Sequence, residues 1–131
     1  MDFWQEHSLE YLEMALKMDF RGRLDKPDGY GKRVGECGDT VEFFIVIDDK
    51  AEEIDRKIVK ICYDIDGCKN TNACANTVVR MAENLTVAEA WESITPEAVV
   101  SYLKTLPSDE NHCAELAVGA FYLALKGLYK K

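Results

Sequence analysis

The chain has 131 residues, 47% of them hydrophobic and 31% charged, a balance that fits one globular domain with one core. Its 16 basic residues against 24 acidic ones give a net charge of −8, which argues against a nucleic-acid-binding protein. The longest apolar run, Phe43 to Ile47, is far shorter than the roughly 18 residues of a membrane span, and the N-terminus lacks the basic start and apolar core of an export signal. We therefore expect a cytoplasmic protein that binds no membrane, whose five cysteines are thiols or metal ligands rather than disulfides.

The N-terminal half predicts a helix followed by three strands. An amphipathic helix capped by Asp2 is predicted over residues 3–18 from apolar side chains at spacings of three and four, which are Leu9, Leu12 and Leu16, with Tyr11 and Ala15 beside them. The glycine-rich segment 19–36 is expected to end in a short edge strand, followed by an alternating strand over residues 40–47. A further strand over residues 58–65 is expected to face the core with every second side chain, which are Val59, Ile61, Tyr63 and Ile65.

The C-terminal half predicts four helices. The first follows Gly67-Cys68, is capped by Asn70 or Thr71, and places on one face Cys74, Val78, Met81 and Ala82. Thr86 and Glu89 match a capping box, and Pro96 begins a helix that ends near Leu106. A last helix from about Ser108 carries a stripe of apolar side chains, which are Cys113, Leu116, Ala117, Ala120, Phe121, Ala124 and Leu128. This order predicts an α+β fold, a three-stranded antiparallel sheet with about five helices packed mainly on one face.

Three of the cysteines lie where secondary-structure elements meet. Cys37 precedes a strand, whereas Cys68 and Cys113 begin helices, where the helix dipole favours the thiolate and where we expect easier ionisation. Asp39 follows Cys37 by two residues and adds an oxygen donor. Three sulfurs with one oxygen suit zinc or an iron–sulfur cluster, although single cysteines are more often small buried hydrophobic residues.

Short glycine and cysteine motifs recur in a fixed order along nearly the whole chain. They are Asp28-Gly29, Val34-Gly35, Cys37-Gly38-Asp39, Gly67-Cys68, Leu106-Pro107 and His112-Cys113. In this order and in these structural contexts they resemble the IscU/NifU N-terminal family of iron–sulfur cluster assembly scaffolds. The resemblance implies that residues 1–131 form a single scaffold domain of this type, a binding protein rather than an enzyme.

The resemblance also assigns roles to individual residues. It implies that Cys37, Cys68 and Cys113 bind a labile 2Fe-2S cluster, that Asp39 tunes its lability, and that His112 is an alternative ligand. Zinc suits the same ligands. Sulfur would arrive as a persulfide from a cysteine desulfurase, with Cys113 or Cys37 as the accepting thiol, and the cluster would pass to apo acceptor proteins.

Two segments depart from the family pattern. Residues 69–72 replace small residues with Lys-Asn-Thr-Asn, and Glu110 stands where members that recruit a dedicated Hsp70 have lysine, which argues against such a partner. One alternative is a SufU-like protein that uses zinc to accept a persulfide, although the insertion typical of that branch is missing. Another is a purely structural zinc domain.

Two cysteines lie outside the three-cysteine pattern. Cys74 lies on an apolar helix face, and we expect a core thiol there rather than a fourth ligand. Cys62 shares its strand face with Lys60 and Asp64, and we expect neither a core nor a ligand position.

Overall fold

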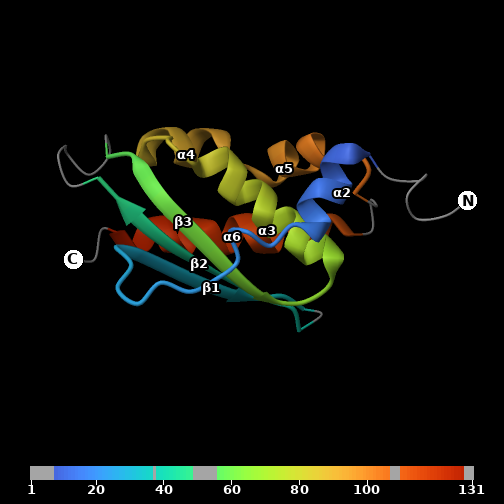
Figure 1. The fold of residues 1–131 in the computed structure, drawn as a ribbon, viewed down its shortest axis with the longest axis horizontal. Coiled ribbons are helices and arrows are strands. Elements are labelled where there is room, and N and C mark those ends of the chain that lie inside the picture. Colours follow the sequence, from blue (N-terminus) through green and yellow to red (C-terminus); the bar gives the residue numbers. More distant parts are fainter. Residues whose placement is uncertain (1–7, 37, 49–55, 107–109, 129–131) are drawn as a thin grey trace, which may run out of the picture.

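The computed structural model describes residues 8–36, 38–48, 56–106 and 110–128. Within these ranges the chain forms three antiparallel strands and five helices, as the sequence predicts (Figure 1). The elements are α2 (Leu9–Leu16), β1 (Gly29–Val34), β2 (Thr40–Ile47), β3 (Ile58–Asp66), α3 (Lys69–Ala82), α4 (Val87–Ser93), α5 (Pro96–Leu103) and α6 (Asn111–Gly127). No helix in the described ranges is long and apolar enough to cross a bilayer.

The sheet has the order β1-β2-β3, with the helices gathered on one face (Figure 1). Strand β2 is central, and its alternation places Val41, Phe43 and Ile45 in the core with no exposed surface. The Phe43 ring meets Phe121 of α6 edge-on, at 5.7 Å between ring centroids. This contact joins the sheet to the helix that carries the apolar stripe predicted from the sequence, and every residue of that stripe is buried.

A β-bulge changes which face of β3 meets the core. The register between β2 and β3 shifts at Val46/Ile47, so that Val46 pairs with Lys60 whereas Ile47 pairs with Ile58. Ile58 is therefore buried, and Val59 is 55% exposed. The prediction that Val59 faces the core is wrong because the strict two-residue alternation breaks at the bulge, whereas it holds for Ile61, Tyr63 and Ile65.

Helix α2 buries only part of the predicted apolar set. Its N-cap is Ser8, whose hydroxyl accepts from the Tyr11 amide, and the predicted cap Asp2 lies outside the described residues. Leu9 is 74% exposed, whereas Tyr11, Met14 and Ala15 are buried. The prediction therefore holds for Tyr11 and Ala15 and is wrong for Leu9 and Leu16, which is 44% exposed.

Two asparagines of α3 hold the end of α2. The buried Asn72 amide donates to the carbonyl oxygens of Met14, Ala15 and Lys17 at 3.0–3.2 Å, and Asn76 donates to Met14 and Lys17. These are carbonyl groups that a helix end leaves without intrahelical partners. The two side chains therefore act as a C-cap supplied by another helix.

Local capping signals were accurate for α4 and α5. Thr86 and Glu89 form the predicted capping box, and Thr95 caps α5 with Pro96 at its start. Helix α3 begins earlier than predicted, with Cys68 as its N-cap. Thr71, one of the two predicted caps, lies instead inside the first turn and is fully buried.

Candidate metal centre

The starts of β2, α3 and α6 lie at the same end of the molecule, on the right in Figure 1. The hydroxyl of Thr71, in the first turn of α3, brings together one side chain from each region. It donates to Asp39 Oδ2 at 2.6 Å and lies 3.7 Å from Cys68 Sγ and 3.8 Å from Cys113 Sγ. Since a hydroxyl carries one proton, the near oxygen of Asp39 is its main acceptor, and the sulfur contacts are weaker.

Two glycines position the Asp39 carboxylate, Gly38 through its backbone conformation and Gly67 through the space that it leaves. Gly38 has φ +89°, a conformation that side chains rarely adopt, and its amide donates to the Gly35 carbonyl at 3.0 Å. At Gly67 a Cβ atom would lie 2.7 Å from Asp39 Oδ2. Glycine at both positions therefore lets Asp39 approach the first turn of α3.

Four residues were expected as the principal metal ligands, and three of them lie in the part of the chain that the structure describes. Cys68 is exposed, Asp39 is half-buried and Cys113 is buried. Cys37, the fourth, lies outside the described residues. The structure thus brings together Asp39, Cys68 and Cys113 through Thr71.

Cys113 does not have the easily ionised thiol that its helix position suggested. Its pKa is raised to about 12, chiefly by burial and also by the contact with Glu110, while the Thr71 hydroxyl opposes the shift. The expectation from the helix dipole failed because loss of solvation outweighs the dipole. A bound metal ion would take the place of this proton.

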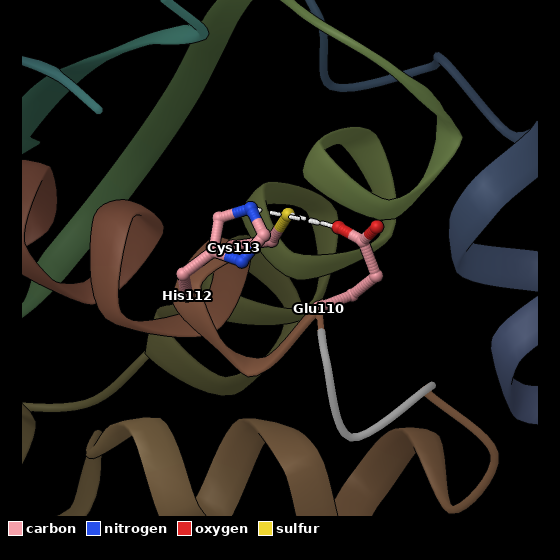
Figure 2. A group of neighbouring side chains, drawn as sticks. All are labelled: Glu110, His112 and Cys113. Carbon is pink, nitrogen blue, oxygen red and sulfur yellow. Dashed lines mark hydrogen bonds and ion pairs between the residues drawn. The ribbon is translucent and has the colours of Figure 1, made fainter. Parts of the chain in front are cut away.

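A second contact group lies at the start of α6. Glu110 Oε2 is 3.5 Å from Cys113 Sγ and 3.5 Å from His112 Nε2, and Figure 2 shows the three side chains pointing toward one another. The three ligand atoms all lie within 4.8 Å of one another. His112, proposed as an alternative ligand, is therefore next to Cys113, with an acidic oxygen between them.

The two remaining described cysteines lie as expected. Cys74 is buried on the inner face of α3, and burial raises the pKa of its thiol well above the ordinary value. Cys62 is half-buried on β3, opposite Phe44 of β2. Neither side chain belongs to the contact groups around Thr71 and Glu110 in the described part of the chain.

Thr71 and Glu110 are site residues that the sequence motifs did not identify. Each lies three residues from a cysteine, Thr71 from Cys68 and Glu110 from Cys113, a spacing that places two side chains on one face of a helical turn. In the comparison with the family pattern, Thr71 and Glu110 drew attention only because they lie in the two segments that differ from it. The three-residue spacing was the one available signal for a role at the site.

The donor set is that of a site for a soft or borderline metal. Thiols from the starts of two helices and a carboxylate from the residue before a strand converge on Thr71, and the other available donors are an imidazole and a second carboxylate. Zinc and iron both accept sulfur, nitrogen and oxygen ligands of these kinds. The residues therefore fit a zinc ion or iron held with sulfide.

Comparison with known proteins agrees with this chemistry. The model of the NifU-like N-terminal domain matches residues 18–131. Two proteins of Archaeoglobus fulgidus, named iron–sulfur cluster assembly scaffold proteins IscU 1 and IscU 2, are each 31% identical over 112 residues, which cover 84% of this chain and 68% of the relative.

Solved structures share the fold at low sequence identity. A putative iron–sulfur cluster assembly scaffold protein for the SUF system from Fervidobacterium islandicum superposes with a TM-score of 0.73 at 16% identity, covering 95% of this chain and 99% of that one. The N-terminal part of a NifU-like protein from Brucella abortus gives a TM-score of 0.71 at 16% identity, covering 95% of this chain and 94% of that one. By its sequence match and its fold, the chain belongs to the family of NifU-like N-terminal domains.

Proposed function

We propose that this protein is a scaffold that builds a labile 2Fe-2S cluster and transfers it to apo-proteins. The observation that carries the proposal is the convergence of Asp39, Cys68 and Cys113 on the Thr71 hydroxyl, in a member of a family whose curated relatives are named as cluster assembly scaffolds. Residues 1–131 act in this proposal as a single scaffold domain.

The proposed cluster ligands are Cys37, Cys68, Cys113 and Asp39, with His112 as an alternative. A scaffold must release what it holds, and a carboxylate oxygen binds iron less firmly than a thiolate does. The Asp39 position is then the one through which an acceptor thiolate enters. A ferredoxin, which keeps its cluster, is typically held by four cysteines.

Sulfur is proposed to arrive as the persulfide of a cysteine desulfurase, with Cys113 or Cys37 as acceptor. The acceptor thiol loses its proton, and its sulfur attacks the outer sulfur of the donor persulfide. The donor S–S bond breaks, the donor cysteine leaves as a thiolate, and a new persulfide forms on the scaffold without net oxidation. Reduction to sulfide then takes two electrons from an external reductant.

The proposed partners follow from this chemistry. They are a cysteine desulfurase and apo iron–sulfur proteins of the cytoplasm, and no dedicated Hsp70 is included because Glu110 replaces a basic residue in the segment before His112. The scaffold itself has no catalytic residue in this proposal, since partners supply the sulfur and the electrons.

The test is anaerobic reconstitution. Ferrous iron, cysteine and a cysteine desulfurase are incubated with the protein, the absorption spectrum and the iron and sulfide contents are measured, and an apo-ferredoxin is then added. A cluster of about two irons per site that moves to the ferredoxin is expected. Failure to form any cluster would refute the proposal.

Single variants test the ligand assignment. Cys113→Ser is expected to abolish stable assembly. Cys62→Ser, which changes a residue of β3 outside the proposed ligand set, is expected to assemble normally. Asp39→Ala is expected to form a cluster and to slow its transfer to apo-ferredoxin, and unchanged transfer kinetics would contradict Asp39 as the labile position. Equal behaviour of Cys113→Ser and Cys62→Ser contradicts the assignment.

A second function, zinc-dependent acceptance of a persulfide, uses the same donors. The observation in its favour is that two thiols with a carboxylate also suit a tetrahedral zinc site. The reconstitution experiment separates the two functions, because this alternative gives tightly bound zinc and a persulfide without a cluster.

A further inference from the structure

The Glu110 side chain has no role in the ligand set proposed above, yet it lies between two of that set's donors. Its Oε2 atom is 3.5 Å from Cys113 Sγ and 3.5 Å from His112 Nε2. Asp39 and Cys68 do not belong to this compact group of described donors. Glu110, His112 and Cys113 are therefore a separate three-donor arrangement that shares Cys113 with the group around Thr71.

The two separations made by the Glu110 oxygen match those of a tetrahedral metal site. Bonds of about 2.0–2.1 Å to nitrogen or oxygen and about 2.3 Å to sulfur place neighbouring ligand atoms about 3.3–3.6 Å apart. The two separations made by Glu110, both 3.5 Å, lie in this range before any ion is bound. The distances from Glu110 to the other two donors then need to change little when a cation enters.

Charge and access also suit a divalent cation. A carboxylate and a thiolate together supply two negative charges, and the third donor is an imidazole. The side chains of Glu110 and His112 are 31% and 49% exposed. His112 also lines a cavity of about 440 Å³ together with the carboxylates of Glu36 and Glu115.

Arg33 is the basic side chain in the lining of that cavity, and it does not block the approach of a metal ion to His112. Its guanidinium and Cδ lie against Gly119, where a Cβ atom would be 1.9 Å from an Arg33 nitrogen. Gly119 is about two helical turns along α6 from His112. The lining thus has two carboxylates, those of Glu36 and Glu115, against the one guanidinium of Arg33.

We propose that Glu110, His112 and Cys113 form a loading site for a divalent metal ion, with Glu110 as an oxygen ligand that the cluster itself does not use. This inference deepens the proposed function, because the ion taken up there would be the ferrous iron used for assembly. Three donors leave the fourth tetrahedral position open. Cys113 lies 3.8 Å from Thr71, the hydroxyl that also contacts Asp39 and Cys68, so iron can exchange ligands toward those residues without leaving Cys113.

The test is titration of the metal-free, reduced protein with Co²⁺, without sulfide or desulfurase. Cobalt bound to the Cys113 thiolate gives a sulfur-to-metal charge-transfer band, and its ligand-field bands report the other donors. Glu110→Gln is expected to weaken Co²⁺ binding at least tenfold and to change the ligand-field bands. Glu92→Gln, which changes an exposed carboxylate on α4 outside this cavity lining, is the matched control and should bind as the wild type does.

Two further variants make the test decisive. The double variant Asp39→Ala/Cys68→Ser should still bind one Co²⁺ with the charge-transfer band, because the loading site keeps all its donors. Glu110→His should recover binding with shifted bands, since it replaces an oxygen ligand with a nitrogen ligand. Recovery by histidine also shows that the loss in Glu110→Gln is not caused by misfolding.

Opposite results overturn the proposal. If Glu110→Gln binds Co²⁺ like the wild type, or if the double variant loses the charge-transfer band, the loading site does not exist. The outcome is independent of the cluster experiment. Normal cobalt binding with no cluster under reconstitution refutes the scaffold function, whereas normal cluster assembly with unchanged cobalt binding in Glu110→Gln refutes only the loading site.

Discussion

At the scale of single residues, Thr71 is the side chain that organises the candidate centre. It is fully buried, it donates to Asp39, and it contacts the sulfurs of Cys68 and Cys113. In the metal-free protein the hydroxyl thus holds Asp39 in a defined position. A bound metal would compete with Thr71 for the Asp39 carboxylate.

Removing this hydroxyl should be measurable as a loss of stability. Thr71→Val keeps the shape of the side chain and leaves the Asp39 carboxylate without its donor, and we expect a loss of about 1.5–3 kcal/mol in the free energy of unfolding. Urea unfolding of the metal-free protein measures it. Thr77→Val is the control, because the Thr77 hydroxyl bonds only a carbonyl of its own helix, that of Ala73. Equal losses in the two variants would contradict the role given to Thr71.

The Cys113 thiol predicts a pH dependence of stability. Its pKa is raised to about 12 in the folded protein from an ordinary 9.0, so between these values the folded chain keeps a proton that the unfolded chain has released. Rising pH therefore favours unfolding over this window, by about 1.4 kcal/mol per pH unit from this group. Denaturant unfolding from pH 8 to pH 11, with reductant and chelator present, should show a steeper loss for the wild type than for Cys113→Ala. Parallel curves would show that Cys113 ionises normally.

At the scale of elements, β1 and α6 approach so closely that side chains are excluded between them. A Cβ atom on Gly31 would lie 2.3 Å from both the Ala120 carbonyl oxygen and the Ala124 amide nitrogen. Backbone atoms of a helix cannot move aside as a flexible side chain does. Gly31 and Gly29 thereby fix the position of α6 against the edge of the sheet, and α6 carries His112 and Cys113.

A methyl group at this contact should separate the two elements. Gly31→Ala is expected to lower the free energy of unfolding by about 3 kcal/mol or more, because the helix backbone atoms that the new methyl group would meet cannot move away without separating β1 from α6. Gly22→Ala is the control, because a Cβ there meets nothing within 4 Å, and it should change stability by no more than about 0.5 kcal/mol. Thermal melts followed by circular dichroism give the comparison. Similar melting temperatures for the two variants would mean that β1 and α6 are not in the contact described.

At the scale of the whole molecule, the candidate centre draws on elements far apart in the sequence. Asp39 immediately precedes β2, Cys68 caps α3 and Cys113 lies in the first turn of α6. In the unfolded chain these donors are separated, and the folded core brings them together. A metal ion that binds them therefore binds the folded state in preference to the unfolded one.

Zinc should accordingly stabilise the entire fold. At a free zinc concentration of about a thousand times the dissociation constant, we expect about 4 kcal/mol of added stability and a higher melting temperature. The gain should be reversed by a chelator, kept in Cys62→Ser and lost in Cys113→Ser, because Cys113 belongs to both donor groups. Calorimetry with and without zinc measures it. A gain that persists in Cys113→Ser would place the metal elsewhere.

The sequence by itself determined features that depend on near neighbours in the chain. The alternation of residues 40–47, the capping box at Thr86 and the stripe on α6 are each carried by residues a few positions apart, and each was confirmed. The short motifs around Cys68 and Cys113 are local in the same sense, and the family that they indicate is the one whose model matches residues 18–131.

Tertiary structure decided what depends on partners distant in the sequence. The bulge that exposes Val59 follows from pairing with β2, and the cap at the end of α2 comes from Asn72 and Asn76 of α3. The role of Thr71 and the raised pKa of Cys113 arise from packing between elements. Periodicity and capping act over one or two turns, whereas burial and side-chain convergence are properties of the assembled core, and no local pattern encodes them.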